Sequence, residues 1–493
     1  HSGVVYVGPP AAAFDRSWPA GSAEAAAAAA GQGYAEFKAL HAQRPATLYV
    51  GANDGMLHAL DAGSGKERFA YVPYAAYHRL MELARPFVGA EVFVDLTPTV
   101  RDVYTNGAWR TLLVGGLRRG GQGVYALDVT DPAITESAAA SKVLWEFNDA
   151  SSGGADLGYT YAQPFITRLA HGGWVVLLPA AYNSAEADAA PGSGSGVMFV
   201  LDAGTGSVLR KFNLGSAGAG LTTAMAADLD GNEITEYAYA GDLAGQIWRF
   251  DLSADVPTAW DVELFFDPAT PGARPITAQP RLLLDPASGR PWVLVGTGKY
   301  LEPTDRSPNV PVQAFYGILD QGALPIEEDE LAQRTLLLDG EQRRVEGPVP
   351  GADDRGWMLK LASITGERVI NAASLRVAAG RVLFTTLIPQ SEDPCIPGAS
   401  GYLLALDARR GGPSEDGVPL LDANGDGELS DADDPEVVGS KIDSFVSGIA
   451  VVVPPGGGVD AVLLPDKVIK TPGFDWRRRS WRDTSLDLLE PGP

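Results

Sequence analysis

Short apolar runs, separated by Gly, Asp, Asn and Pro, follow one another along almost the whole chain. Apolar runs of this length between turn residues are typical of β-strands joined by hairpins. One unit recurs, in which an apolar strand ends in Leu-Asp or Phe-Asp and a turn of small residues follows. The Asp of this unit stands at Asp61, Asp128, Asp202, Asp251, Asp320 and Asp407.

The recurring unit has a simple physical basis, because the strand end can pack inside while the Asp carboxylate accepts hydrogen bonds from turn amides. A second element, a strand that ends in Gly, precedes many of these units, as at Gly51, Gly115 and Gly296. Together the two elements predict antiparallel sheets that repeat along the chain. A propeller blade needs about 40–50 residues, so the length predicts roughly six to eight blades. A pair of β-sandwiches is the alternative architecture.

Helical patterns are limited to short insertions. The Ala-rich segment 22–43 favours helix, and Gly31 and Gly33 are expected to divide it into two pieces. Weaker helical patterns cover residues 74–84 and 327–334. We therefore expect an all-β fold with short helical insertions.

The charge of the chain narrows the classes of partner. The 493 residues carry 62 acidic and 38 basic side chains, a formal net charge of −24. A protein that binds nucleic acid needs a cationic face, so nucleic acid is not expected as a partner. The acidity suits either solubility or the binding of divalent cations. No apolar stretch approaches the roughly 20 residues of a membrane-spanning helix, so we expect no membrane span.

The single cysteine and the start of the chain bear on the compartment of the protein and on whether it is part of a longer precursor. Cys395 is the only cysteine, so no disulfide can form within the chain. A lone cysteine slightly favours a reducing compartment, and its distance in sequence from any histidine argues against a catalytic nucleophile. The chain begins at His1 without an initiator Met or a signal peptide. We expect it to be part of a longer precursor that carries any targeting signal.

The segment 228–236 has the spacing of a calcium-binding loop. Oxygen-bearing side chains occupy its positions 1, 3, 5 and 9, a backbone carbonyl is available at position 7, and Gly231 permits a sharp bend. Strand-like sequence on both sides predicts that the loop closes a hairpin. A metal-free turn is the alternative, but three crowded carboxylates would repel one another without a cation. The predicted ligands are Asp228, Asp230, Asn232, Ile234 and Glu236.

A second acidic loop, residues 422–433, matches the twelve-residue EF-hand template. Gly427 stands at the bend, and Asp433 takes the last position, where Glu is usual. The segment Pro413–Pro419 precedes the loop in place of a helix, so we expect an isolated structural calcium loop. A solvated acidic linker is the alternative. The predicted ligands are Asp422, Asn424, Asp426, Glu428 and Asp433.

Several strings of the sequence add up to a family resemblance. They are the VGANDGMLHA of residues 50–59, the loop 228–236 with the YAGD of residues 239–242, the VGTGKY of residues 295–300 and the RSWR of residues 479–482. Together they resemble the C-terminal domain of the PilY family, the type IV pilus-associated adhesins and biogenesis factors. The resemblance covers nearly the whole chain, so we expect one propeller domain, residues 1–483, and a C-terminal tail, residues 484–493.

The resemblance implies a modified, quinoprotein-like β-propeller of about seven blades, exported to the pilus tip or the cell surface. It implies roles in pilus assembly, in the balance of extension and retraction during twitching motility, and in adhesion. The implied partners are minor pilins and a host-cell or abiotic surface. In the family, calcium in the hairpin loop controls this balance, which here maps onto the loop 228–236. Glu236 departs from the usual Asp, which puts the affinity for calcium in doubt.

Two other functions stay open from the sequence. A quinoprotein-type dehydrogenase has similar blades, but it needs a base carboxylate beside a calcium-held quinone and a cofactor-capping pair of cysteines, which a chain with one cysteine lacks. A purely structural scaffold that docks minor pilins has no sequence feature that separates it from an adhesin. We expect no enzymatic activity, no catalytic residues and Ca²⁺ as the cofactor.

Overall fold

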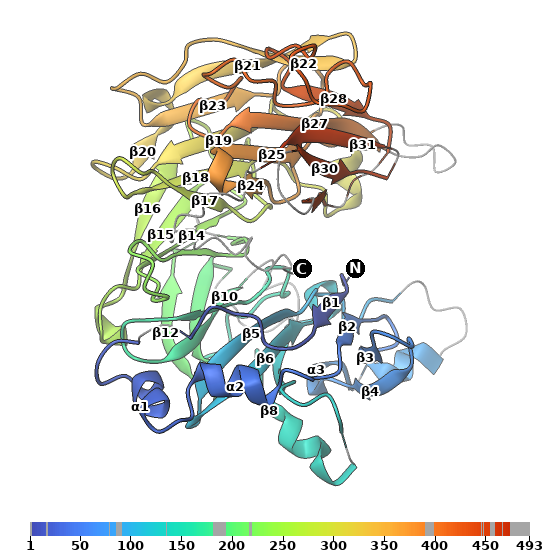
Figure 1. Ribbon diagram of the computed structural model, residues 1–493, viewed down its shortest axis with the longest axis vertical. Coiled ribbons are helices and arrows are strands. Elements are labelled where there is room, and N and C mark those ends of the chain that lie inside the picture. The colour runs from blue at the N-terminus through green and yellow to red at the C-terminus, as the bar shows by residue number, and fades with distance from the viewer. Residues whose placement is uncertain are drawn as a thin grey trace. The chain divides into compact units, whose positions relative to one another are not determined.

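The computed structural model describes residues 2–15, 18–77, 79–84, 91–134, 136–180, 194–215, 219–389, 399–444, 446, 448–453, 459–465 and 467–473. Cys395, the string at 479–482 and the predicted tail 484–493 lie outside these residues. Within them the chain consists mostly of short β-strands with few helices (Figure 1). This composition confirms the predicted all-β fold with short helical insertions.

The chain divides into two compact units. The first unit contains His1–Ala226, Asn232–Ala238 and Phe250–Val262, and the second contains Ala227–Gly231, Tyr239–Arg249 and Glu263–Pro493. Each unit has its own hydrophobic core, with buried Trp145 and Trp174 in the first and buried Trp357 in the second. Burial of apolar side chains in these cores is the main force that holds each unit together.

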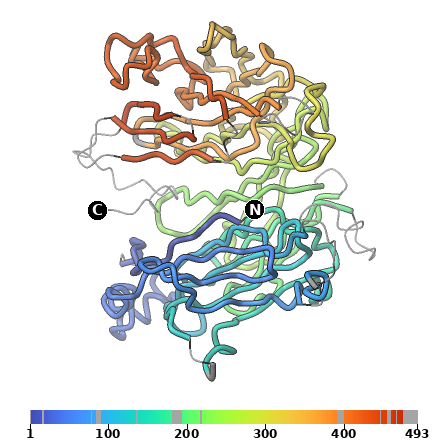
Figure 2. The backbone as a smooth tube through the Cα atoms, turned by 90° about the vertical axis from the view of Figure 1, so that its right-hand side faces the viewer, coloured from blue at the N-terminus to red at the C-terminus, as the bar shows by residue number. Residues whose placement is uncertain are grey.

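Three four-stranded antiparallel sheets make up most of the first unit, and each has its strands in order along the chain. Figure 2 shows strands of the first sheet side by side in blue. The strands are β1 (Val5–Val7), β2 (Thr47–Gly51), β3 (Leu57–Asp61) and β4 (Glu67–Tyr71); β5 (Thr99–Thr105), β6 (Ala108–Gly116), β7 (Gly123–Asp128) and β8 (Val143–Asn148); and β9 (Phe165–Arg168), β10 (Trp174–Ala180), β11 (Val197–Asp202) and β12 (Val208–Asn213).

A fourth sheet has the order β13-β14-β15-β16-β20. Its first four strands follow one another along the chain, as in the other sheets, and β20 adds in parallel to β16. The strands are β13 (Met225–Ala227), β14 (Tyr237–Gly241), β15 (Ile247–Asp251), β16 (Asp261–Asp267) and β20 (Ile326–Glu327).

The second unit contains an eleven-stranded sheet and a three-stranded sheet, β29-β30-β31. The hairpin β21–β22 extends the larger sheet, because β21 pairs in parallel with β23 while β22 pairs with β28. One sheet therefore does not equal one blade, and the count of about seven blades stays a prediction. The strands are β17 (Arg281–Leu284), β18 (Pro291–Gly296), β19 (Ala314–Leu319), β21 (Ala332–Asp339), β22 (Gln342–Glu346), β23 (Gly356–Lys360), β24 (Ser374–Arg376), β25 (Arg381–Thr385), β26 (Ile388–Pro389), β27 (Ala399–Asp407), β28 (Gly439–Ile442), β29 (Ala450–Val452), β30 (Val459–Leu463) and β31 (Val468–Pro472).

The helices are short, as the sequence predicts. The Ala-rich segment forms α1 (Ala23–Ala29) and α2 (Tyr34–Leu40), and the break between them at Gly31 and Gly33 is confirmed. The second segment forms α3 (Tyr74–Tyr77) and the 3₁₀ helix η1 (Leu80–Ala84). The predicted helix at 327–334 is wrong: after one 3₁₀ turn, η7 (Glu328–Glu330), the chain enters β21. The other 3₁₀ helices are η2 (Arg118–Gly120), η3 (Glu136–Lys142), η5 (Pro257–Ala259), η6 (Pro303–Arg306) and η8 (Val377–Ala379).

Five of the six recurring Asp carboxylates accept the predicted hydrogen bond from a turn amide, whereas Asp320 accepts from the Tyr239 hydroxyl and the Arg249 guanidinium instead. Oδ1 of Asp202 accepts from the amides of Gly204 and Thr205 at 3.0 and 2.9 Å, and Asp61 and Asp407 accept from their own turns in the same way. In these five turns the carboxylate therefore closes the bend after its strand.

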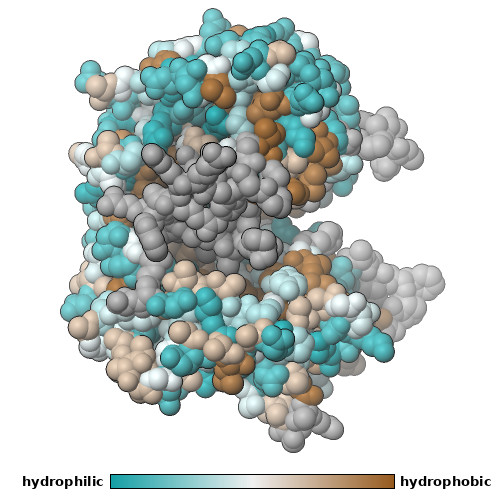
Figure 3. Space-filling view, in the orientation of Figure 1, coloured by the Kyte–Doolittle hydropathy of each residue, from teal (hydrophilic) through white to brown (hydrophobic). Residues whose placement is uncertain are grey.

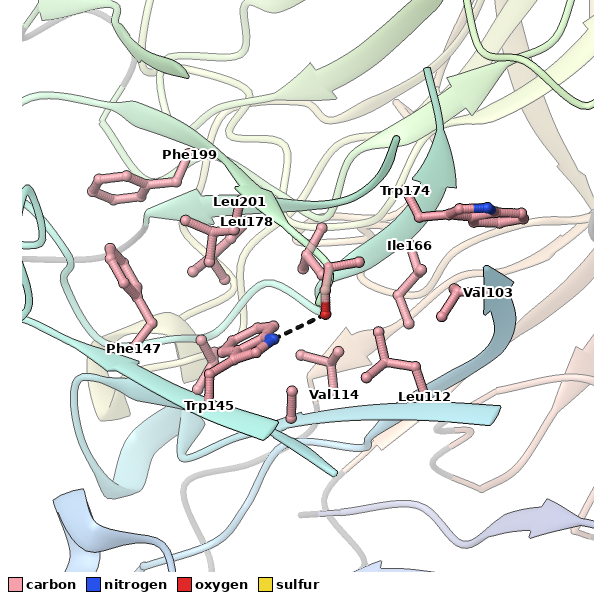
Figure 4. Packing of buried hydrophobic residues seen from close by; sticks show 14 of the residues in the cluster. Val103, Leu112, Val114, Trp145, Phe147, Ile166, Trp174, Leu178, Phe199 and Leu201 are labelled. Atoms are coloured by element: carbon pink, nitrogen blue, oxygen red, sulfur yellow. Dashed lines mark hydrogen bonds between the residues drawn. The ribbon is translucent and has the colours of Figure 1, made fainter. Parts of the chain in front are cut away.

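Tryptophans pack on two of these turns. Nε1 of Trp145 donates to the carbonyl of Ala203 at 2.9 Å, the bond drawn in Figure 4, and Nε1 of Trp357 donates to that of Ala408 at 3.0 Å. The turn glycine of each pair, Gly206 or Gly411, has a positive φ and lies against the indole ring. The ring of Trp145 thus joins two consecutive sheets of the first unit, whereas the ring of Trp357 links two segments of the eleven-stranded sheet.

Substitution of Gly206 by Ala measures this packing. A Cβ on Gly206 would lie 2.7 Å from the ring of Trp145, whereas a Cβ on Gly65, which has the same φ of +70°, meets nothing within 4 Å. Both variants have the same backbone strain, so Gly206→Ala is expected to lower the free energy of unfolding by about 1–3 kcal/mol more than Gly65→Ala. Chemical denaturation of the two variants checks this, and equal losses would contradict the packing described.

The surface carries few clues to a partner. Hydrophobic residues form scattered patches between hydrophilic ones on the face that Figure 3 shows, and the exposed large apolar side chains, such as Tyr6, Leu40 and Met81, come from separate segments. Among the residues that the structure describes, no helix has both the length and the apolar character needed to cross a bilayer.

Candidate metal centre

The first acidic loop, residues 228–236, connects β13 and β14, which are neighbours in one sheet. The prediction that it closes a hairpin between strands is therefore confirmed. Hydrogen bonds within the bend include one from the amide of Gly231 to Asp228 Oδ1 at 2.7 Å and one from the amide of Ile234 to Asn232 Oδ1 at 2.7 Å. Gly231 has a φ of +76°, which only glycine adopts without strain.

The loop brings three carboxylates together. One oxygen each from Asp228, Asp230 and Glu236 lies within 4.8 Å of the others, and no other group of three His, Cys, Asp or Glu side chains in the described part of the chain meets this criterion. Asp230 is exposed and the other two are half-buried. Gathered anions of this kind repel one another unless a cation binds between them.

The donor set fits a hard divalent cation. Calcium takes six to eight oxygen ligands from carboxylates, carbonyls and water, and the three carboxylates are oxygen donors with no competing nitrogen or sulfur. The structure thus gathers the acidic members of the predicted set, while the roles of Asn232 and the Ile234 carbonyl stay predictions.

Residues outside the loop anchor it, and the sequence analysis did not identify them. Glu233 has a φ of +67°, and its Oε2 lies 3.6 Å from Nη2 of Arg101 on β5. The amide of Thr235 donates to the carbonyl of Arg168 at 2.9 Å, and its hydroxyl bonds with that of Thr167 at 2.7 Å. These partners are distant in sequence, so no local pattern could have predicted the contacts.

The second loop, residues 422–433, is held differently. The carboxylates of Asp422 and Asp433 are 8% and 2% exposed and accept hydrogen bonds from the loop's own amides, including Gly425, Gly427 and Ser430 at 2.8–2.9 Å. The three remaining predicted ligands, Asn424, Asp426 and Glu428, are exposed. The carboxylates of this loop are already engaged in hydrogen bonds with turn amides. Calcium binding by the loop therefore stays a prediction.

A third acidic group surrounds His58 on β3. Its Nε2 lies 2.8 Å from Asp54 Oδ2, and its Nδ1 lies 2.6 Å from Glu67 Oε2. Only an imidazolium donates at both nitrogens. Burial lowers the pKa of His58, but the hydrogen bonds to Glu67 and Asp54 outweigh it and raise that pKa above its ordinary value.

This arrangement predicts a pH dependence of stability. Since the pKa of His58 is raised in the folded chain, its stabilising effect is complete below the unfolded pKa and is lost as pH rises through the folded pKa. We expect an effect of up to about 1 kcal/mol for such half-exposed pairs. Unfolding of the wild type and His58→Gln across pH 5–9 checks this. Parallel curves for the two proteins would contradict it.

Comparisons with known proteins relate this chain to a family. A family model described as the PilY1 beta-propeller domain matches residues 21–331. The chain is 34% identical over 472 residues to a type IV pilus biogenesis factor PilY1 homolog of Xylella fastidiosa, in an alignment that covers 91% of this chain and 36% of that protein. It is 34% identical over 435 residues to type IV pilus biogenesis factor PilY1 of Pseudomonas aeruginosa, covering 77% of this chain and 36% of that protein.

A solved structure agrees with these matches. The crystal structure of the Pseudomonas aeruginosa PilY1 C-terminal domain superposes with a TM-score of 0.73 at 27% identity, and the alignment covers 94% of this chain and 99% of that one. The chain spans 36% of the length of the two curated relatives named above.

Proposed function

The chain belongs to the PilY1 β-propeller family, and from this we propose that it acts in type IV pilus biogenesis as a calcium-binding, non-enzymatic domain. The curated relatives that align with most of this chain are named type IV pilus biogenesis factors. We propose that the protein is exported and that it is located at the pilus tip or the cell surface. The proposed partners are minor pilins and, for adhesion, a host-cell or abiotic surface.

One observation carries the calcium part of the proposal: Asp228, Asp230 and Glu236 gather their oxygens within 4.8 Å in one hairpin. Bound there, Ca²⁺ would neutralise the carboxylates and stiffen the hairpin. A stiffened hairpin offers a way for calcium to bias the balance between pilus extension and retraction, which underlies twitching motility.

Calorimetric titration with calcium tests the site. We expect the wild type to bind Ca²⁺ and Asp230→Ala to bind at least about tenfold more weakly, since a charged ligand is lost. Asp426→Ala, in the loop 422–433, is the matched control. If Asp426→Ala loses the heat instead, the calcium belongs to the second loop.

The pilus role needs a cellular test. A type IV-piliated bacterium that lacks its own protein of this family is complemented with the full-length protein, wild type or Asp230→Ala. We expect the wild type to restore surface pili and twitching that responds to calcium supply, and Asp230→Ala to restore pili with twitching that no longer responds to calcium in this way. Failure of the wild-type protein to restore pili would refute the pilus role, and unchanged twitching in the variant would refute the calcium control.

The alternative of a quinoprotein dehydrogenase finds little support in the buried carboxylates. Burial raises the pKa of Asp242 to about 7 against its hydrogen bonds, as a general base would need. However, Asp242 is 0% exposed, and its oxygens accept from Trp248 Nε1 and the Gln246 amide at 2.8 and 2.9 Å. Dye reduction after reconstitution with pyrroloquinoline quinone and calcium would revive that alternative.

A structural scaffold without a receptor of its own is the remaining alternative. It shares the pilin partners, so binding to purified minor pilins does not separate the two. The two are separated by comparing the binding of the full-length protein to cells or glycan arrays with its binding to minor pilins. A scaffold is expected to bind only the minor pilins.

A further inference from the structure

Glu233 has a backbone conformation that its residue type disfavours. Its φ of +67° lies in the left-handed region, which is unfavourable for an L-residue other than Gly, Asn or Asp. Counted from Asp228, it stands at the sixth loop position, where calcium loops of the EF-hand type have an invariant Gly. A residue that stays in such a conformation is held by its surroundings.

Arg101 is one contact that holds Glu233. Its Nη2 lies 3.6 Å from Glu233 Oε2, with the two side chains only 20% and 15% exposed. Nη1 of the same guanidinium donates to the carbonyl of Ile166 at 3.0 Å. Its planar head also lies 5.5 Å from the ring centres of both Phe14 and Trp174, which adds cation–π attraction. Arg101 is therefore fixed by three neighbours besides the loop.

A second path leads from the loop in the same direction. Thr235 is bound to the carbonyl of Arg168, and the Arg168 guanidinium makes a bidentate ion pair with Glu24 of α1 at 2.7 and 3.1 Å. The Arg168 and Glu24 side chains are 2% and 1% exposed. Arg168 also lies 5.3 Å from the ring centre of Trp18. Buried pairs of this kind hold a fixed geometry because breaking them leaves an unpaired charge.

Both arginines thus contact the loop on one side and the N-terminal arm, residues 8–15 and 18–44, on the other. Arg101 touches the arm at Phe14, and Arg168 touches it at Trp18 and Glu24. The arm carries α1 and α2, drawn in dark blue in Figure 1.

We infer that Arg101 and Glu233 are positioning residues of the calcium loop, and that through Arg101 and Arg168 cation binding is coupled to the packing of the N-terminal arm. The inference rests on the proposed calcium site. Arg101 keeps Glu233 in the left-handed conformation that the closed loop needs, and the same arginine lies on the arm. By linkage, ordering of the loop by calcium stabilises the arm, and loosening of the arm weakens calcium binding by the same factor.

Two double variants of equal charge test the positioning role by calcium titration. Arg101→Gln with Glu233→Gln and Arg101→Gln with Glu233→Gly each remove one cation and one anion, so long-range electrostatics cancel. Only glycine adopts the left-handed conformation without Arg101. We expect the first variant to bind Ca²⁺ about five- to tenfold more weakly than wild type, and the second to recover to within about threefold. Equal affinities for both variants would overturn the positioning role.

Hydrogen exchange tests the coupling on the same proteins. In the wild type, calcium is expected to slow amide exchange of α1 and α2 at least about threefold. In both double variants this protection is expected to be smaller even where calcium still binds, because only the Arg168 path remains. Arm exchange that does not respond to calcium while the loop becomes protected would overturn the coupling and leave the proposed site intact. A wild type that binds no calcium would overturn the proposed site and this inference together.

Discussion

Replacement of Arg343 by Met is expected to lower the free energy of unfolding by about 3–5 kcal/mol. Arg343, on β22, is 0% exposed, and its Nη2 donates to Glu367 Oε2 at 2.6 Å. The other oxygen of Glu367 accepts from the Thr386 hydroxyl at 2.8 Å, and the guanidinium lies 4.4 Å from the ring centre of Tyr402. Without Arg343 the Glu367 charge stays buried and unpaired, which is the costly outcome.

A double variant distinguishes the effect of the Arg343–Glu367 ion pair on stability from the effect of side-chain packing. Arg343→Met with Glu367→Leu removes both charges, so most of the lost stability is expected to return. Burial raises the pKa of Glu367 against the opposing effects of Arg343 and Thr386. In the single variant Glu367 can take up a proton, so the loss of stability should shrink as pH falls. Denaturant unfolding at pH 5 and 8 checks both expectations, and a double variant as unstable as the single one would contradict them.

Calcium at about 100 times its dissociation constant is expected to add about 2.7 kcal/mol to the stability of the folded chain, because it binds the hairpin only when the hairpin is formed. EGTA should reverse the rise in melting temperature. Magnesium should not replace calcium, since it demands a smaller and more regular shell of ligands. Differential scanning calorimetry of the wild type and Asp230→Ala checks this. If calcium raised the melting temperature of Asp230→Ala by the same amount, the stabilising calcium would be bound outside this hairpin.

Local features of the fold could be predicted from the sequence because neighbouring residues make them. The Asp202 turn uses amides within three residues of the carboxylate, and the break between α1 and α2 follows from Gly31 and Gly33. The hairpin at 228–236 follows from strand-like residues on either side of an acidic turn. Each depends on propensities that a short window contains.

Features that depend on distant residues could not be predicted. Residues 327–334 have helix-favouring side chains, but β21 pairs in parallel with β23 and antiparallel with β22, and these tertiary hydrogen bonds override local propensity. The anchoring of Glu233 by Arg101 joins segments with no shared pattern. In the loop 422–433 the hydrogen bonds of Asp422 and Asp433 are local, but the burial of these two residues is not revealed by the spacing of the carboxylates.

The acidic hairpin between β13 and β14 is the feature on which the proposed calcium control depends. The most direct test is anomalous X-ray diffraction from a crystal of this chain grown with calcium, measured near the X-ray absorption edge of calcium. The account predicts an anomalous peak about 2.3–2.6 Å from oxygens of Asp228, Asp230 and Glu236. A map with no peak at this hairpin at saturating calcium would contradict it.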